Sequence, residues 1–514
     1  MFDAFELKRR DLMKVLAAAG LTTLGHSLSP AIARAEQPVR GGRLRVGVKG
    51  GSTGDSLDPT IISAAVQYFV AYQFGNCLVE RDVSGRLVGE LAESWEPQDG
   101  GKKWVFKLRK GIKFHNGGEF TAEDVLHAIN RHTAPDSRSS VKTQLGRIER
   151  VTASNPYELT FELKQIDVYF PYLLTSPALV IMPKDADPES GIGTGPYILD
   201  EAEPGVRYML HRNPDYFKPD SAWYDEVEVL VLNDEAARVS ALVSGTVDAI
   251  TLVPPQLVSG IGETAGLKVA TAVSTTFNLF VMRCDIEPFN NKDLRLAMKH
   301  AVDREQMVNA ILAGYGDVGN DSPVNTVYPL YPDDLPVFSY DIEKAREYYK
   351  KSGHSGPIRL HVSEAAFPGA IDAAMLYQQS AARAGIEIEL VREAADGYWD
   401  DVWLKAPFCA SYWGANSTED QALSIAYETG APWNDTYWSN PEFDKLLAEA
   451  RSELDEAKRK AIYRQAIQMV QEDGGHIIFM FPHTIASYSD RIANFALDHF
   501  GATGKITERT WFRA

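Results

Sequence analysis

The sequence predicts an α/β protein with more than one hydrophobic core. Its 514 residues exceed what a single core usually supports, and either three to four units or two large lobes would suit this length. Segments with period-two alternation, typical of half-buried strands, recur between segments with helical spacing. A hydrophobic content of 45% with 24% charged residues is ordinary for a globular chain, so we expect no extensive disorder.

The first 35 residues predict an export signal. The basic start contains Arg9-Arg10 and resembles the twin-arginine motif, and the apolar run at 15–25 is too short to span a bilayer. Ala33-Arg34-Ala35 fits a small-x-small cleavage site. No cysteine lies near this site, so we expect no lipid anchor. An uncleaved amphipathic start is the alternative. We expect a mature periplasmic protein.

Net charge and cysteine usage restrict the partners and the redox chemistry. A formal charge of −18 argues against a nucleic-acid partner and favours a soluble monomer. Cys77, Cys284 and Cys409 are odd in number and lack CxxC spacing. We expect buried free thiols, with a single disulfide as the alternative.

The elements of the first half follow from periodicity and from turn residues. The strand at 42–48 breaks at Gly50-Gly51, and a helix is expected over 64–78. A helix at 235–244 is stopped by Gly245. Further strands are predicted at 158–163 and 247–250.

The second half returns to strand character at 275–282. Asp303 predicts a helix start with Gln306 at its third position, and Asn440-Pro441 predicts another. Further helices are expected at 341–351 and 371–384, and strands at 386–390 and 477–481.

The stretch from 90 to 131 gives the densest local signal. Trp104, Phe106 and Leu108 alternate as in a strand, Gly111 and the cluster at 115–118 predict turns, and a second short strand should follow. Thr121 predicts a helix N-cap, with Asp124 completing an imperfect capping box.

This stretch closely resembles the signature of the family 5 periplasmic solute-binding proteins, the peptide, dipeptide and nickel class that feeds ABC importers. In that family a segment of the type AESW…(W/Y)xFxLRxGxxFHxGxxFTAEDV recurs. The Leu-Asp-Pro at 57–59, GTGPY at 193–197, RNPDY at 212–216 and ALVSGTVD at 241–248 also resemble family segments. The resemblance covers roughly residues 40–490.

The resemblance implies a two-lobed periplasmic binding protein of α/β class, with mixed sheets joined by hinge crossovers and an extra subdomain in the first lobe. The expected limits are 1–35 for the signal peptide, 36–273 for the first lobe with an inserted subdomain at about 76–180, 274–482 for the second lobe, and 483–514 for the return to the first lobe.

The glycine run at 191–195 could suggest a nucleotide loop. That mechanism needs a helix N-terminus behind the glycines to hold phosphate, whereas Pro196 and the strand-like residues after it leave no such helix. We therefore do not expect nucleotide binding.

Aromatic and short polar residues crowd the stretch 398–438, well above the chain's aromatic content of 10%. Loops of this composition are typical of concave small-molecule sites. In peptide-binding relatives an acidic residue just past an aromatic–glycine pair binds the ligand's α-amino group, a role that could fall here to Glu419 or Asp420. The family's ligand also lies near the loop after Leu-Asp-Pro, which makes Thr60, Ser63 and Tyr68 weaker candidates. The predicted ligand-binding residues are Tyr68, Tyr412, Trp413, Asn416, Glu419, Asp420, Trp433 and Asn434.

Catalytic and metal motifs such as HExxH, GxSxG, a Walker loop or an EF-hand do not occur in the sequence. We expect neither an enzyme nor a resident cofactor or metal, but a receptor that delivers a small solute or peptide to an inner-membrane ABC permease. A sugar, an opine-like compound or chelated nickel stay open as ligands, and a secreted hydrolase is the rival class.

Overall fold

The computed structural model describes residues 38–414, 416–499 and 503–514. The predicted export signal and its cleavage site lie outside these ranges. Residues 38–514 form one compact unit. Within the described ranges, every helix is too short or too polar to cross a lipid bilayer.

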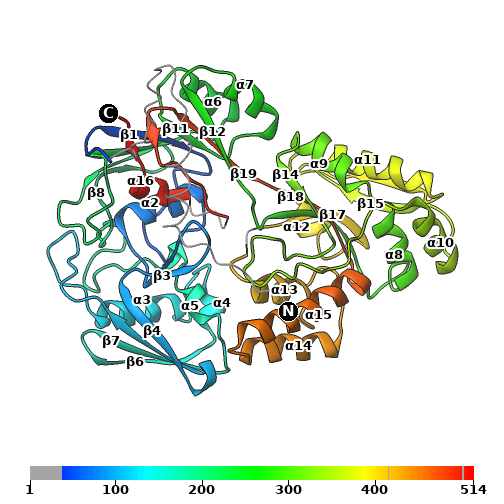
Figure 1. Cartoon of the computed structure of the whole chain (residues 1–514), viewed down its shortest axis with the longest axis horizontal. Coiled ribbons are helices and arrows are strands. Elements are labelled where there is room, and N and C mark those ends of the chain that lie inside the picture. Colours follow the sequence, from blue (N-terminus) through cyan, green and yellow to red (C-terminus); the bar gives the residue numbers. More distant parts are fainter. Residues whose placement is uncertain (1–37, 415, 500–502) are drawn as a thin grey trace, which may run out of the picture. The chain divides into compact units, whose positions relative to one another are not determined.

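A seven-stranded sheet gathers segments from both ends of the chain. β1 (Arg43–Val48) pairs in parallel with β10 and β11, and buries its alternating Leu44, Val46 and Val48 as predicted. The strand order is β12-β19-β11-β1-β10-β9-β8, so blue, green and red strands meet in Figure 1. The other strands are β8 (Tyr197–Glu203), β9 (Arg207–Arg212), β10 (Glu226–Val231), β11 (Ala249–Thr251), β12 (Leu267–Ala272) and β19 (Thr484–Ser489).

A four-stranded antiparallel sheet forms within the predicted inserted subdomain. Its order is β4 (Ala92–Gln98), β5 (Lys103–Leu108), β7 (Glu158–Leu163) and β6 (Ile148–Asn155). Trp104, Phe106 and Leu108 are buried as the alternation predicts. Helix α3 (Ala122–Thr133) begins where predicted, because the Thr121 backbone N–H donates to Asp124 Oδ2 at 2.9 Å.

The predicted second short strand after Gly111 is not formed. Lys113 and Glu119 make one isolated bridge, and the N–H of Gly117 donates to the carbonyl of Phe114 to close a tight turn. The turn residues at 115–118 leave too few residues on either side for a ladder.

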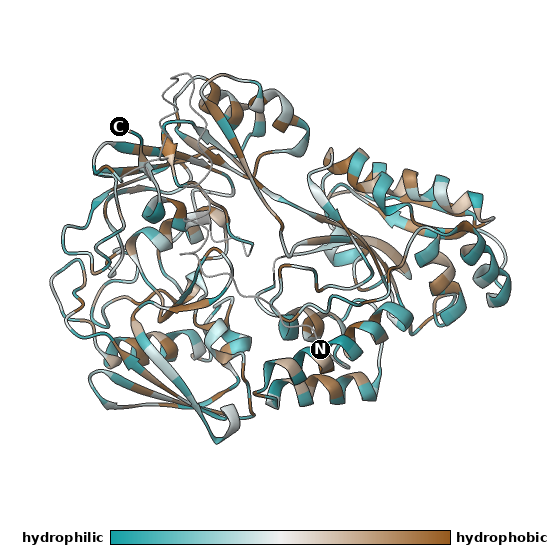
Figure 2. Cartoon of the chain, viewed as in Figure 1, coloured by the Kyte–Doolittle hydropathy of each residue, from teal (hydrophilic) through white to brown (hydrophobic). Residues whose placement is uncertain are grey.

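A six-stranded sheet forms the second large layer, in the order β14-β18-β13-β17-β15-β16. β13 (Phe277–Met282) is buried along its whole length between β17 (Phe408–Trp413) and β18 (His476–Pro482). The other strands are β14 (Gly316–Val318), β15 (Ile358–Val362) and β16 (Ile388–Arg392). In Figure 2 the helices beside this sheet carry both hydrophobic and hydrophilic colours, as amphipathic helices do.

Two of the longer helices begin at the residues that their capping signals predict. Asp303 accepts from the N–H of Gln306 at 3.1 Å, and Asn440 accepts from Glu442 and Phe443 ahead of Pro441. The longer helices are α2 (Ala65–Phe74), α6 (Glu235–Val243), α8 (Lys292–His300), α9 (Arg304–Leu312), α10 (Ile342–Ser352), α11 (Ala370–Arg383), α13 (Glu419–Tyr427), α14 (Pro441–Ser452) and α15 (Glu456–Asp473).

Short elements complete the chain. The helices are α4 (Lys142–Leu145), α5 (Phe170–Leu173), α7 (Val258–Gly262), α12 (Tyr398–Asp401) and α16 (Ile506–Arg509). The strands are β2 (Val79–Arg81), β3 (Leu87–Gly89), β20 (Ile492–Ala493) and β21 (Trp511–Phe512).

The chain passes between the two large sheets twice. It leaves the first sheet at Ala272 and enters the second at Phe277, then leaves the second at Pro482 and re-enters the first at Thr484. The predicted lobe limits, after residues 273 and 482, fall in these two connections. That the two lobes and the inserted subdomain are separate domains stays a prediction.

The glycine-rich loop at 191–195 packs against the end of α2 instead of preceding a helix. A Cβ at Gly195 would lie 2.4 Å from the carbonyl oxygen of Gln73, and one at Gly193 would lie 2.2 Å from that of Phe74. The glycines therefore permit a close backbone approach. The three cysteines are free, with Cys77 and Cys409 buried and Cys284 half-buried.

Two hydrophobic cores account for most of the buried side chains. One is formed around the six-stranded sheet and the other around β1, α2 and the four-stranded sheet. Tyr169 is an exception to this division, because it lies in the first lobe by sequence and in the core of the second by packing.

Candidate functional site

The stretch that the sequence identified runs from the end of β17 into α13. Tyr412 and Trp413 end the strand, and Thr418 caps the helix by accepting from the N–H of Gln421 at 3.1 Å. Because successive strand residues point to opposite faces, Tyr412 is 47% exposed whereas Trp413 is 6% exposed.

Five aromatic side chains form a continuous cluster beside this loop. Trp413 lies 6.2 Å from Trp433, Trp433 lies 6.2 Å from Trp403, and Trp399 joins Trp403 to Tyr412 at 5.9 and 5.6 Å. Trp433 is exposed, and the buried Nε1 of Trp413 finds no acceptor among the described residues. We call this group the aromatic cluster; three of its members were predicted site residues.

A buried polar network holds the aromatic cluster in place. Trp403 Nε1 donates to Asp435 Oδ2 at 3.0 Å, and Asp435 Oδ1 lies 2.6 Å from His476 Nε2. The other nitrogen of His476 lies 2.7 Å from the Tyr427 hydroxyl, and His476 and Asp435 have no exposed surface. A His–Asp pair with both nitrogens occupied and no access from solvent positions the loop and cannot reach a substrate.

Glu419 and Asp420 are both engaged by other groups of the protein. Glu419 Oε1 accepts from the N–H of Leu330 at 2.7 Å, and Asp420 lies 2.7 Å from Arg451 Nε. Burial raises the pKa of both carboxyls, an effect that Arg451 opposes at Asp420. A solute contact by either acid stays a prediction and would require exchange of these partners.

The two predicted asparagines are buried and hydrogen-bonded within the protein. The backbone carbonyl of Asn416 accepts from the hydroxyls of Thr275 and Tyr328, both at 3.2 Å. Asn434 Nδ2 donates to the carbonyl of Trp438 at 2.8 Å. In this arrangement both shape the loops that carry the aromatic cluster.

A cavity of about 370 Å³ lies next to the same loop. Tyr68, on α2, lines it together with Thr175 and Ser176, and its contact with a ligand stays a prediction. Ser417 and Gln421 line it from the second lobe. The other predicted residues shape the adjoining loop or lie in the aromatic cluster.

Sequence reasoning missed Ser417 and Gln421. They lie beside the predicted Asn416 and Asp420, and the Gln421 side chain accepts from the N–H of Ser417 at 2.7 Å. The N-cap at Thr418 could have identified Gln421, since the third residue after an N-cap points back toward the preceding loop.

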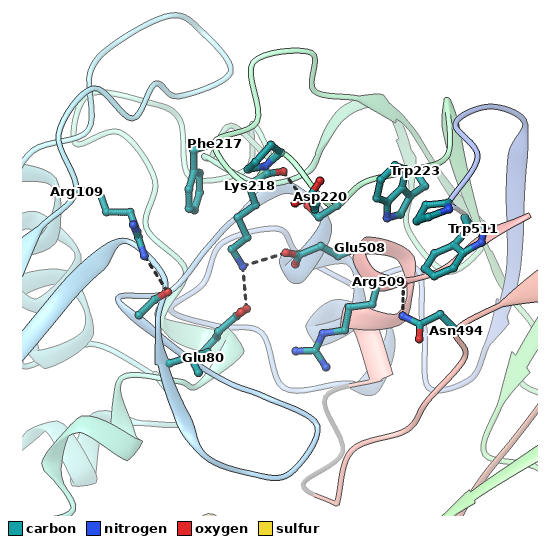
Figure 3. A pocket seen from close by; sticks show the side chains of 15 residues that line it. Glu80, Arg109, Phe217, Lys218, Asp220, Trp223, Asn494, Glu508, Arg509 and Trp511 are labelled. Carbon is teal, nitrogen blue, oxygen red and sulfur yellow. Dashed lines mark hydrogen bonds and ion pairs between the residues drawn. The ribbon is translucent and has the colours of Figure 1, made fainter. Parts of the chain in front are cut away.

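A cluster of five buried and half-buried charges lies beside this cavity, and its Glu80, Glu90 and Lys505 line the cavity. The ammonium of Lys218 lies 2.9 Å from Glu80 and from Glu508 (Figure 3), and that of Lys505 lies 2.5 Å from Glu90. We call these residues the charge cluster; three carboxylates and two ammonium groups give it one net negative charge. Glu80 lines both this cavity and a second cavity of about 760 Å³.

Pairing with the two lysines favours the ionised form of Glu90 and Glu508. Burial opposes ionisation of Glu90, but Lys505 and Lys218 outweigh it and hold the pKa of Glu90 at about 2. The pKa of Glu508 is lowered in the same way. Oxygens of Glu80, Glu90 and Glu508 approach one another within 4.8 Å, a spacing that could suit a metal ion, but two ammonium groups already pair with these carboxylates and leave one net negative charge.

The comparisons with known proteins agree on one class. Residues 86–435 match the model of the bacterial extracellular solute-binding proteins, family 5 Middle. Di/tripeptide-binding protein 1 of Pseudomonas aeruginosa (strain UCBPP-PA14) is 25% identical over 81% of this chain and 85% of its own. Oligopeptide-binding protein AppA of Bacillus subtilis (strain 168) is 27% identical over 89% of each chain. The structure of HbpA2 from Haemophilus parasuis superposes with a TM-score of 0.82 at 20% identity, over 92% of this chain and all of that one.

Proposed function

From the premise that this chain belongs to the family 5 bacterial extracellular solute-binding proteins, we propose that it captures a short peptide or peptide-like solute in the periplasm and delivers it to an inner-membrane ABC permease. It performs no chemistry on that solute. The observation that carries the proposal is the cavity of about 370 Å³, lined from one lobe by Tyr68 and from the other by Ser417 and Gln421.

The cavity suits a short solute. Small-molecule sites commonly enclose about 300–1,000 Å³, and this one lies at the lower end of that range. The names of the two sequence relatives, a di/tripeptide-binding and an oligopeptide-binding protein, support a peptide. Trp413 lies four residues before the cavity residue Ser417. Its Nε1 has no acceptor among the described residues and could donate a hydrogen bond to a peptide carbonyl.

The acids of the β17–α13 loop argue for a second candidate. Glu419 and Asp420 already have partners, so either acid would have to exchange its partner before it could bind a peptide's α-amino group. An uncharged or anionic solute, such as a sugar or an opine-like compound, needs no such anchor. Chelated nickel gains no comparable support from the described residues.

Calorimetry with the purified mature protein tests the proposal. A panel of di- and tripeptides is titrated first, together with a sugar and an opine-like compound, after mass spectrometry has identified whatever co-purifies. Tyr68→Ala and Gln421→Ala should weaken binding of the best peptide at least tenfold, because both remove contacts in the cavity. Gln465→Ala, an exposed glutamine of α15, is the matched control and should change nothing.

The outcomes separate the candidates. Binding of peptides that is lost in the two cavity variants supports the peptide receptor. If only the sugar or the opine-like compound binds, the proposed ligand class is wrong and the proposed receptor role is supported. Saturable hydrolysis of peptides or esters would refute the receptor role itself.

A further inference from the structure

Two neighbouring residues, Tyr169 and Phe170, are buried in different hydrophobic cores. Phe170 packs in the first-lobe core, 5.0 Å from Phe161 of β7. Tyr169 is 8% exposed and belongs to the core around the six-stranded sheet. The chain at this point therefore inserts one side chain from the first lobe into the second.

The ring of Tyr169 is held by α15 of the second lobe. It lies 6.2 Å from the ring of Tyr463, and the guanidinium of Arg459 lies 5.3 Å from its centre. Both tyrosine hydroxyls are buried, and that of Tyr169 lies near the Tyr463 hydroxyl and the Glu419 carboxylate without a hydrogen bond of ordinary geometry among the described residues. The contact is therefore made by ring packing and a cation–π interaction.

One backbone hydrogen bond reinforces the contact, and ion pairs on each side hold its neighbouring residues. The N–H of Val168 donates to the carbonyl of Arg451, near the end of α14, at 3.3 Å. Arg451 also binds Asp420 and Glu428, at 2.7 and 2.8 Å. On the first-lobe side Asp167 pairs with Arg147 at 2.8 Å.

The insertion is connected to the solute cavity through α5. Tyr172 lies 5.9 Å from Tyr169, and the guanidinium of Arg81, a cavity residue, lies 5.1 Å from the ring of Tyr172. Thr175 and Ser176, immediately after α5, line the cavity. Tyr169 itself does not line it, as far as the described residues show.

We propose that Tyr169 is a latch: a positioning residue that stabilises the arrangement in which the two lobes enclose the cavity, without touching the solute. The two crossings near residues 273 and 483 are the hinge about which the lobes separate. A hinge with a second, removable contact has two discrete arrangements, and the latch sets their ratio. That the enclosed space holds a solute rests on the proposed function.

Two measurements on the purified mature protein test the latch, and neither needs a ligand. Tyr169→Ala should raise the radius of gyration in small-angle scattering. Its amides at 168–176 should exchange with deuterium at least tenfold faster, while those of β5 and β13 keep their protection. Tyr169→Phe should stay much closer to wild type than Tyr169→Ala in both readouts, because it keeps the ring that packs against Tyr463 and Arg459. Tyr157→Ala, in the same lobe and away from the second-lobe core, is the matched control.

An unchanged radius and unchanged exchange in Tyr169→Ala would overturn the latch. Loss of protection in both large sheets would also overturn it, since Tyr169 would then support the fold and not the arrangement. If the alanine variant does not fold, Tyr169→Leu retains an apolar side chain and should shift both readouts in the same direction. Because the protein is measured alone, failure of every peptide to bind would refute the proposed ligand and leave this result standing.

Discussion

Glu90 is a fully buried charge with two ion-pair partners, and two separate routes give the cost of replacing it. The carboxylate has no exposed surface and lies 2.5 Å from Lys505 and 3.1 Å from Lys218. It also accepts from Asn76 Nδ2 at 2.7 Å and from the N–H of Cys77 at 2.8 Å. Glu90→Gln keeps the shape and removes the charge.

The first route is the loss of one partner from a buried ion-paired group, which costs about 3–5 kcal/mol. The second is the pKa of Glu90, which falls from the usual 4.5 to about 2 and corresponds to about 3 kcal/mol at about 1.4 kcal/mol per unit. We therefore expect Glu90→Gln to lower the free energy of unfolding near neutral pH by about 3 kcal/mol.

The pH dependence has a definite sign. A carboxyl whose pKa is depressed by folding contributes its stability above the unfolded value of 4.5 and loses it as the pH falls toward 2. The gap between wild type and Glu90→Gln should therefore shrink to about 2 kcal/mol near about pH 3.5.

Urea unfolding of both proteins across this pH range measures the gap. Glu201→Gln removes an exposed carboxylate paired with Arg207 and should cost less than about 1 kcal/mol. A gap below about 1 kcal/mol for Glu90→Gln, or one that does not change with pH, would refute the reasoning.

Two further predictions address packing and export. Gly195→Ala should destabilise the fold by about 1–3 kcal/mol, because its Cβ would lie 2.4 Å from the Gln73 carbonyl oxygen, whereas Gly260→Ala meets no atom within 4 Å and should be neutral in the same thermal unfolding assay. Replacement of Arg9 and Arg10 by lysine should leave the precursor in the cytoplasm, because the export receptor reads the arginine pair as an address. Normal periplasmic accumulation of the double variant, judged by cell fractionation, would show that the general secretion route is used.

Local sequence signals determined the class of the fold and most of its elements. Alternation at Trp104, Phe106 and Leu108 predicted β5, and the Thr121–Asp124 pair predicted the start of α3. Such elements can be predicted from the sequence because strand period and capping geometry depend on neighbours within four residues. The prediction of a short strand after Gly111 was wrong, because a ladder also depends on how many residues the neighbouring turns leave to pair.

The site depended on contacts that sequence spacing does not encode. Glu419 and Asp420 stand in the right loop for a ligand, but α13 turns them toward Leu330 and Arg451, far away in sequence. The charge cluster joins Glu90 to Lys505 across 415 positions, and no local pattern connects such a pair. The sequence alone therefore determined what kind of protein this is. The tertiary structure decided which polar groups stay available to a solute, because burial and pairing are settled only when distant segments pack together.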